Sequence, residues 1–279
     1  MLTKTQLKEV FAKYGFRPLK RLGENYLIDG NIRDKIISEA GALSGDRVLE
    51  IGPGLGALTI DLARSGAAVT AVEKDKKAYG ILEEIIGDDF PSLRIFNEDI
   101  LKFDIKKASA AGKLKVVGCL PYYITTPIIE CLIDNRLSIK YVVMVVQKEF
   151  ADRILAEPGA KDYSSLSCFI QYYTRPKHIY KIKRTSFYPS PDIDSSLVRL
   201  DILDRPSVEA KDDGALFKVI RGSFNQRRKS IINSLSREEV LGIPKERLSS
   251  ILEKIAVDPA SRPESLSLAD FARIANSID

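Results

Sequence analysis

The feature that most limits the possible folds is an alternation of short apolar runs with amphipathic stretches, which begins at residue 47. The runs RVLEIG, AAVTAVE, LRIFN and KLKVVG are rich in β-branched residues, and stretches with helical spacing lie between them. Strands that alternate with helices in this way predict βαβ units and a parallel sheet. The apolar run YVVMVVQ, residues 141–147, is typical of a strand buried on both faces of such a sheet. We therefore predict an α/β fold.

The pattern changes after this run. The segments HIYKIKRTSFYP and SSLVRLDIL are predicted to be two strands that close the sheet in antiparallel orientation, with the turn PSPDID between them. Residues 201–214 are polar and lack a strand period, which is typical of a linker. Beyond them, helical spacing interrupted by turn residues predicts a small helical domain. We expect one domain over residues 1–204 and a helical C-terminal domain over residues 205–279.

Composition excludes several classes of function. Lys and Arg number 43 against 38 Asp and Glu, an excess that matters only where basic residues cluster. Nowhere do 18 uncharged apolar residues run together, and the N-terminal stretch has no apolar run after its basic residues, so we expect a cytoplasmic protein with no membrane partner. The three cysteines lack CxxC spacing and His178 is the one histidine, so neither disulfides nor a metal site is predicted.

The segment LEIGPGLGALT, residues 49–59, places three glycines between an expected strand and an expected helix. Glycines at such a turn allow a ligand to approach the backbone closely. Gly52, Gly54 and Ala57 also match the dinucleotide fingerprint G-x-G-x-x-A, and Glu73 follows about 20 residues later. From this loop alone, a nicotinamide-dependent oxidoreductase stays open beside other nucleoside-binding enzymes.

Two further acids favour a nucleoside other than a nicotinamide dinucleotide. Glu50 precedes the first glycine, and Asp99 ends the strand expected after the one that carries Glu73. Acids at the ends of successive strands suit a nucleoside laid across that edge, with Glu73 accepting from ribose hydroxyls and Asp99 from the adenine amino group. This arrangement indicates an S-adenosylmethionine site. The alternative is that Glu73 and Asp99 only cap the following helices.

Seven motifs together resemble the KsgA-type rRNA adenine N6-dimethyltransferase family. They are GENYLID at 23–29, EIGPGLGALT at 50–59, CLPYYIT at 119–125, VVQKEFADRI at 145–154, FYPSPDIDSS at 187–196, FNQRRKSIINSL at 224–235 and SRPESLSLADFARIAN at 261–276. Many methyltransferases share the glycine motif, whereas the last three are specific. The resemblance implies a Rossmann-like class I S-adenosylmethionine-dependent methyltransferase domain with a small C-terminal helical domain. It also implies methylation of N6 on two adjacent adenosines near the 3′ end of small-subunit rRNA during ribosome biogenesis.

The same resemblance implies the cofactor, the partners and the residues that bind them. The cofactor site is expected to be lined by Asn25, Leu27, Gly52, Gly54, Glu73, Asp99 and Cys119. The partners are small-subunit rRNA and the immature small ribosomal subunit, with the protein acting as a monomer. Basic clusters at residues 4–21, 175–184 and 221–229 suit phosphate contacts. The third lies in a family motif and supplies the expected RNA-binding residues Arg221, Arg227, Arg228 and Lys229, although a solvated face is the alternative for any single cluster.

The motif CLPYYIT is implied to hold the target base. An adenine amino nitrogen is a poor nucleophile, so catalysis needs acceptors for its N–H groups rather than a strong base. The resemblance assigns one acceptor to the side chain of residue 119 and the other to the carbonyl of Leu120, with Pro121 fixing the turn. Tyr122 is expected to stack on the extruded adenine, and Phe187 to form a second aromatic wall. Core packing is the alternative for these rings and is favoured more for the neighbouring tyrosine, residue 123.

The chain departs from the family pattern at two positions. Cys119 stands where the family usually has asparagine, and a thiol is a weak acceptor and a weak donor. Loss of one such transition-state contact costs roughly 2.7–4 kcal/mol, or about 10²–10³ in rate, so we expect an impaired enzyme with an intact fold. Transfer of a methyl group to Cys119 itself is disfavoured because no neighbouring base in the sequence would form a thiolate. Glu24 replaces the usual glutamine, with an effect that the sequence leaves open.

Three alternatives accompany this interpretation. The related large-subunit rRNA adenine dimethylases share the fold, but SRPESLSLADFARIAN favours the small-subunit branch. A ribosome-assembly factor that binds the small subunit with little methylation stays open because of Cys119. The nicotinamide-dependent oxidoreductase is the most distant alternative.

Overall fold

The computed structural model describes residues 3–18, 25–237 and 239–278. Contacts divide the chain into two compact units. Unit 1 comprises Met1–Ala151 and Lys177–Ile202, and unit 2 comprises Asp152–Pro176 and Leu203–Asp279. The domain boundary after residue 204 stays a prediction, and residues 152–176 and 203–204 are the segments that the two divisions assign differently. Glu24 lies outside the described residues.

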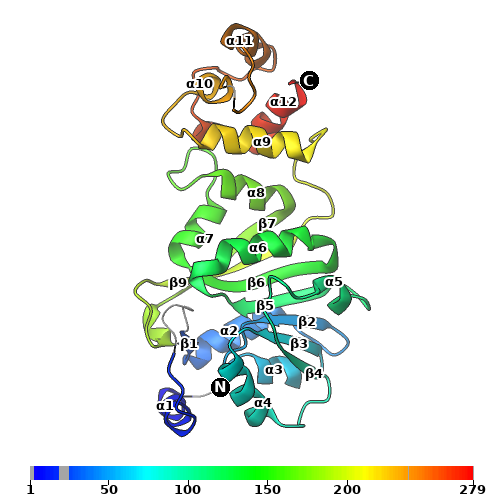
Figure 1. Cartoon of the computed structure of the whole chain (residues 1–279), viewed down its shortest axis with the longest axis vertical. Coiled ribbons are helices and arrows are strands. Elements are labelled where there is room, and N and C mark those ends of the chain that lie inside the picture. The colour runs from blue at the N-terminus through cyan, green and yellow to red at the C-terminus, as the bar shows by residue number, and fades with distance from the viewer. Residues whose placement is uncertain (1–2, 19–24, 238, 279) are drawn as a thin grey trace. The chain divides into compact units, whose positions relative to one another are not determined.

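A seven-stranded sheet has the strand order β4-β3-β2-β5-β6-β9-β7 (Figure 1). Its strands are β2 (Arg47–Ile51), β3 (Ala68–Glu73), β4 (Leu93–Asn97), β5 (Leu114–Cys119), β6 (Ile139–Gln147), β7 (Thr174–Ile182) and β9 (Ser195–Ile202). The neighbours from β4 to β6 pair in parallel, and β9 pairs antiparallel with β6. The predicted α/β fold with an antiparallel closing strand is therefore confirmed.

The helices of unit 1 begin and end at residues that the sequence marks. They are α1 (Lys4–Lys13), α2 (Gly30–Ala40), α3 (Thr59–Arg64), α4 (Lys76–Ile86), α5 (Ile105–Ala108) and α6 (Thr125–Asp134). Asp29 caps α2 by accepting from the N–H groups of Asn31 and Ile32, and Asp75 caps α4 in the same way. Gly41 ends α2 in the left-handed region, where a side chain would be strained.

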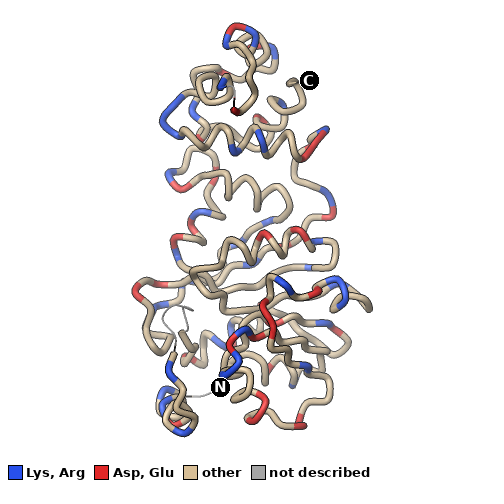
Figure 2. Tube along the Cα trace, viewed as in Figure 1, with Lys and Arg blue, Asp and Glu red and all other residues tan. Residues whose placement is uncertain are grey.

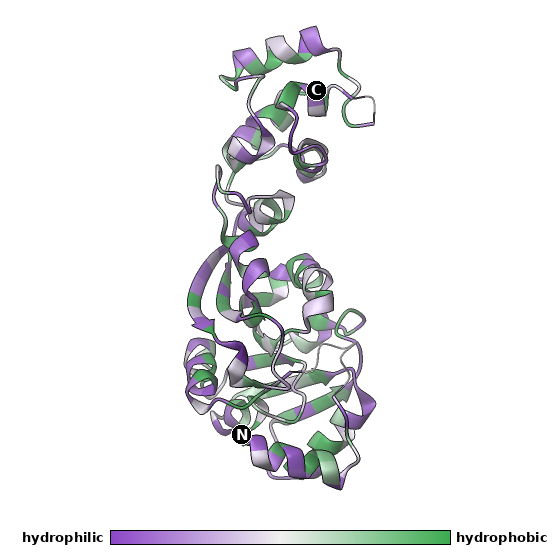
Figure 3. Cartoon of the chain, turned by 90° about the vertical axis from the view of Figure 1, so that its left-hand side faces the viewer, coloured by the Kyte–Doolittle hydropathy of each residue, from purple (hydrophilic) through white to green (hydrophobic). Residues whose placement is uncertain are grey.

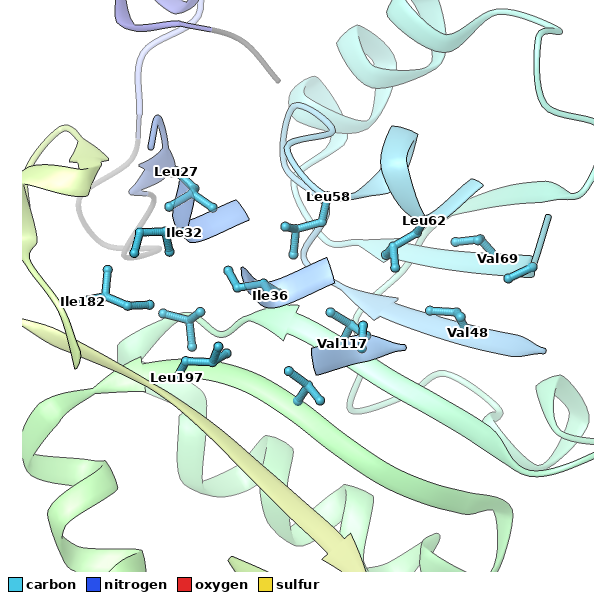
Figure 4. Packing of buried hydrophobic residues seen from close by; sticks show 14 of the residues in the cluster. Leu27, Ile32, Ile36, Val48, Leu58, Leu62, Val69, Val117, Ile182 and Leu197 are labelled. Carbon is cyan, nitrogen blue, oxygen red and sulfur yellow. The ribbon is translucent and has the colours of Figure 1, made fainter. Parts of the chain in front are cut away.

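A hydrophobic core lies between one face of the sheet and the helices that cover it (Figure 4). Ile36 of α2 and Leu62 of α3 pack against Val48, Val69 and Val117 of three neighbouring strands, and all five side chains are at most 1% exposed. Burying each side chain stabilises the fold by roughly 1.5–3 kcal/mol relative to exposure. Hydrophobic residues continue along the central strands β2, β5 and β6 (Figure 3), as expected for strands covered on both faces.

The N-terminal helix α1 packs near the glycine loop. A capping box formed by Thr3 and Gln6 starts it, and Leu7 is buried in a cluster with Tyr26 and Leu55. The short strand β1 (Tyr26–Leu27) pairs antiparallel with β8 (Phe187–Tyr188). Segments far apart in the sequence thus meet beside the ends of the central strands.

Unit 2 is helical, as predicted for the end of the chain. Together with α7 (Lys148–Leu155), which follows β6, its helices are α8 (Ser165–Tyr173), α9 (Asp213–Phe224), α10 (Ile231–Leu235), α11 (Lys245–Lys254) and α12 (Leu268–Asn276). The side chains of Tyr172 and Tyr173 donate to the Asp213 carboxylate over 2.6 and 2.9 Å, which fixes the start of α9 against α8. None of the helices in the described part of the chain combines the length and the apolarity needed to cross a bilayer.

Candidate cofactor and base-binding site

A cleft of about 980 Å³, solvent-open space included, lies in unit 1 at the carboxyl ends of the parallel strands. It is bordered by β1, the glycine loop after β2, the segments after β3 and β4, and the turn after β5. This edge is where open α/β sheets bind ligands. All seven residues predicted for the cofactor line it, namely Asn25, Leu27, Gly52, Gly54, Glu73, Asp99 and Cys119.

The glycine loop needs its glycines. Gly52 and Gly54 have φ angles of +66° and +57°, in the left-handed region that favours glycine. A Cβ atom at Gly54 would lie 3.0 Å from Cε1 of Tyr26, so the β1 segment approaches the bare backbone of the loop. A side chain at either position would strain the loop, and one at Gly54 would also crowd the Tyr26 ring of β1.

Glu73 organises the loop instead of capping α4, which Asp75 does. The Oε2 atom of Glu73 accepts from the Gly54 N–H over 3.0 Å, and Oε1 accepts from the Asp75 N–H over 2.8 Å. Burial raises the pKa of this carboxyl, and the two backbone hydrogen bonds oppose that rise. The helix-cap alternative is therefore wrong for Glu73, whose carboxylate joins two neighbouring segments of the cleft.

Asp99 lies just after β4, at the same edge of the sheet as Glu73. One carboxylate oxygen accepts from the Leu101 N–H over 3.1 Å, and the other lies 2.8 Å from Nζ of Lys74. Partial burial acts to raise the pKa of Asp99, but the Lys74 ion pair and the backbone hydrogen bond hold it below its ordinary value. Asp99 is thus an ionised acceptor at the cleft, and sequence analysis did not foresee its partner Lys74.

Glu50 is the cleft residue whose environment is most unusual. Its side chain is 1% exposed, and its Oε2 atom has no hydrogen-bond partner within the described residues. Burial raises its pKa to about 8, the nearby Glu73 adds to the rise, and the Thr59 hydroxyl opposes it. The sequence singled out Glu50 only as a sign of nucleoside binding, because strand position alone does not reveal a missing partner.

The turn after β5 carries the motif CLPYYIT. The Leu120 N–H donates to the Val145 carbonyl over 3.1 Å, and its side chain is 3% exposed, so the residue is anchored in the core. Pro121 lines the cleft and precedes the short 3-10 helix η2 (Tyr122–Ile124). Burial raises the pKa of the Cys119 thiol to about 12, and Glu50 adds to this effect. The thiol therefore stays protonated, which argues against its acting as a methyl acceptor.

The three aromatic rings of the base-binding motifs differ in exposure. Phe187 is 3% exposed and belongs to the hydrophobic core. Tyr122 is half-buried, and its hydroxyl lies 2.7 Å from Oγ of Ser195. Tyr123 is 48% exposed and lines the cleft. The ranking that favoured core packing for Tyr123 over Phe187 is therefore wrong, because the tight turn of η2 points successive side chains in different directions. Stacking by Tyr122 and Phe187 stays a prediction.

The basic motif FNQRRKS lies between α9 and α10 in unit 2 (Figure 2). Arg227 donates to the carbonyl oxygens of Lys161 and Tyr163 over 2.7 and 3.2 Å, so its guanidinium already joins two segments of this unit. Arg228 and Lys229 are exposed and form no ion pair within the part of the chain that the structure describes. The predicted phosphate contacts are therefore better suited to these two residues.

Comparison with known proteins agrees with the geometry of the cleft. The family model for ribosomal RNA adenine dimethylase matches residues 15–279. Ribosomal RNA small subunit methyltransferase A of Alkaliphilus oremlandii is 39% identical over 275 residues, which cover 97% of this chain and 95% of that protein. The Geobacillus thermodenitrificans protein of the same name is 42% identical, covering 99% and 96%.

Solved structures show the same relationship. A dimethyladenosine transferase from Plasmodium falciparum superimposes with a TM-score of 0.78 and 26% identity, covering 89% of this chain and 95% of that one. The 23S rRNA methyltransferase ErmE gives a TM-score of 0.70 and 25% identity, covering 91% and 99%. The resemblance found in the sequence motifs is thus confirmed: the chain belongs to the ribosomal RNA adenine dimethylase family.

Proposed function

We propose that this protein transfers methyl groups from S-adenosylmethionine to N6 of two adjacent adenosines near the 3′ end of small-subunit rRNA. The observation that carries the proposal is the cleft, where acids from successive strands meet the turn CLPYYIT. The curated relatives are named small-subunit rRNA methyltransferases, which favours this substrate over large-subunit rRNA. The protein would act as a monomer in the cytoplasm, on immature small subunits.

The residues of the cleft fit S-adenosylmethionine by their chemistry. Glu73 and Asp99 are acceptors at neighbouring strand ends, which suits the ribose hydroxyls and the adenine amino group of a nucleoside. The partnerless oxygen of Glu50 adds a buried acceptor in the same cleft. When bound, the cofactor would supply an electrophilic methyl group on a positively charged sulfur.

The protein's own part in the reaction is to hold the target amino group. The Leu120 carbonyl would accept one N–H of the adenine amino group, which increases the availability of the nitrogen lone pair for attack. The anchored Leu120 side chain and the ring of Pro121 fix the direction of this carbonyl. The exposed ring of Tyr123 at the cleft is a further surface for an extruded base. The nitrogen loses its proton to water after the methyl group has been transferred, so no strong base is required.

Cys119 weakens this arrangement. A protonated thiol accepts poorly, so the second N–H of the adenine amino group has no side-chain acceptor at this position. We therefore propose slow methylation. Phosphate contacts by Arg228 and Lys229 would supply subunit affinity independently of the reaction rate.

The test is transfer of labelled methyl groups from S-adenosylmethionine to purified small subunits that lack the modification, followed by mapping of the label in the rRNA. We expect slow labelling of two adjacent adenosines near the 3′ end, and large subunits serve as the substrate control. Labelling of large-subunit rRNA instead would overturn the substrate assignment. Tight subunit binding with no label, even after Cys119→Asn, would favour the assembly factor.

A further inference from the structure

The edge strand β7 carries a concentration of positive charge that the proposed function does not use. It is the last strand of the seven-stranded sheet, so one side of its backbone faces away from the other strands (Figure 1). Ile182 is buried and Ile179 packs against the same core, which fixes this part of the strand in unit 1. The side chains of Lys177 and Tyr180 are exposed, and residues 174–186 contain no Asp or Glu. The exposed side of β7 is therefore basic.

Neighbouring carboxylates neutralise only part of this charge. Asp201 is shared by two cations, with Nζ of Lys177 2.7 Å from Oδ2 and Nε of Arg199 2.7 Å from Oδ1. Lys181 pairs with Asp194 over 3.2 Å. These three cations face two carboxylates, which leaves an excess of positive charge along the strand.

Two further lysines lie beside the strand without a carboxylate partner. Lys183 follows the end of β7 and Lys35 lies on α2; both are exposed, and neither forms an ion pair within the part of the chain that the structure describes. Nζ of Lys35 lies 4.6 Å from the centroid of the Tyr180 ring, which is 42% exposed. An exposed ring beside an ammonium group offers a face on which a base can stack and a charge for the phosphate that follows it.

The basic strand is attached to the wall of the cleft. The chain passes from β7 through the short 3-10 helix η4 (Arg184–Ser186) into β8, which pairs with β1 at the border of the cleft. The Ser186 hydroxyl donates to Oδ2 of Asp29 over 3.0 Å, and the Ser186 carbonyl accepts from the Ile28 N–H over 2.9 Å. Asp29 in turn caps α2, the helix that carries Lys35. The end of β7 therefore lies close to the border of the cleft.

We propose that Lys35, Tyr180 and Lys183 bind an unpaired stretch of the substrate rRNA beside the target adenosines. The two ammonium groups contact phosphates, and one base stacks on the Tyr180 ring. The inference rests on the proposed function and adds to it a binding surface in unit 1, separate from the basic motif of unit 2. Lysines on an edge strand also discourage pairing with a second chain. That role requires no exposed ring held beside a lysine of a helix, so RNA fits the surface better.

The experiment is filter binding of the full protein to purified small subunits that lack the modification, at several salt concentrations. Lys35→Ala combined with Lys183→Ala should lower the slope of log affinity against log salt by about 1.4, as expected for two phosphate contacts to single-stranded RNA. Lys106→Ala combined with Lys107→Ala is the matched control, because it removes the same charge from exposed positions on α5 and should keep the parent slope. An unchanged slope in the first variant, or an equal reduction in both, would overturn the inference.

Two substitutions of Tyr180 test the stacked base. Tyr180→Phe keeps the ring and should bind subunits as the parent does. Tyr180→Ala should weaken binding by about 5- to 150-fold and leave the salt slope unchanged, because stacking on an aromatic ring releases no counter-ions. Parent affinity in Tyr180→Ala would contradict stacking. Sedimentation of the lysine variant tests the other role of an edge lysine, since self-association with an unchanged salt slope would overturn the RNA assignment.

Methyl transfer separates this inference from the proposed function. Lys35, Tyr180 and Lys183 do not line the cleft, so their variants should raise the KM for subunits and leave kcat unchanged. If the parent binds and methylates small subunits and the variants behave in the same way, the inference fails but the proposed function stands. A parent that neither binds nor methylates small subunits would overturn both.

Discussion

Replacing Cys119 by asparagine should raise the rate of methyl transfer. The thiol borders the cleft at the end of β5, and burial keeps its pKa high enough that it offers neither a charge nor a strong acceptor to a bound base. An amide oxygen at the same position would accept one N–H of the adenine amino group, while the Leu120 carbonyl accepts the other. The substitution therefore adds one acceptor to a transition state that already has one.

The size of the effect follows from that single contact. A preorganised acceptor or donor at a reacting group is worth roughly 2.7–4 kcal/mol, which corresponds to about 10²–10³ in rate. The fold should tolerate the change, because Cys119 borders the cleft and an amide there can remain hydrated. A change of 1 kcal/mol in the free energy of unfolding would move the melting temperature by about 2–4 °C in a protein of this size class, so a melting curve detects misfolding.

The assay is single-turnover methyl transfer to unmethylated small subunits at saturating S-adenosylmethionine, which separates the rate of the reaction from cofactor affinity. Cys131→Asn is the matched control, since Cys131 lies on α6 and does not line the cleft. We expect a gain of about 10²–10³ for Cys119→Asn and none for the control. Equal rates in the parent and Cys119→Asn would show that the side-chain acceptor is dispensable, and the reasoning about the turn would fail.

Three other predictions rest on the described residues. Replacing both Arg228 and Lys229 by alanine should weaken subunit binding and lower the slope of log affinity against log salt by about 1–2, because each phosphate contact releases counter-ions. Filter binding at several salt concentrations measures this slope, and an unchanged slope would exclude the contacts. Phe187→Ala should cost about 3–5 kcal/mol in denaturant unfolding because the ring is buried, whereas Tyr123→Ala should change stability by less than about 0.5 kcal/mol and slow methyl transfer. Similar losses of stability in both variants would contradict the exposures. Because burial raises the pKa of Glu50 to about 8, above its unfolded value, its contribution to stability is present at low pH and is lost as pH rises toward 8. Melting curves at pH 5 and pH 8 should show a larger loss of melting temperature for the parent than for Glu50→Gln. Equal losses in the two proteins would refute the raised pKa of Glu50.

The sequence predicted the fold through local patterns of residue type and spacing that match the elements of the structure. The apolar run that became β6 is buried on both faces, and the glycines of the loop adopt the positive φ angles that their type suggested. Their positions at the ends of successive expected strands placed Glu73 and Asp99 at the same cleft. These predictions succeeded because each depends on residue type and spacing along the chain.

The missed features depend on contacts between distant segments. The basic run around Arg227 predicts a phosphate contact, but it does not reveal that Arg227 donates to carbonyl groups 66 and 64 residues away. The exposures of Tyr123 and Phe187 depend on the turn η2 and on the packing of β8, which no local spacing encodes. The Oε2 atom of Glu50 lacks a hydrogen-bond partner within the described residues because the neighbouring strands place no donor beside it. A sequence shows which groups are present but not which of them lack partners after folding.

A single departure from the family pattern connects two parts of this site. An amide has an oxygen that accepts and a nitrogen that donates, so one asparagine can serve both the adenine amino group and a buried carboxylate. The register of β2 and β5 places Cys119 on the same face of the sheet as Glu50, and its protonated thiol is a weak acceptor and a weak donor. The two consequences are separable, because the loss of the acceptor appears in the rate at saturating cofactor, while the loss of the donor appears in the pH dependence of stability. The residue at position 119 therefore affects both the methylation of the base and the ionisation of Glu50.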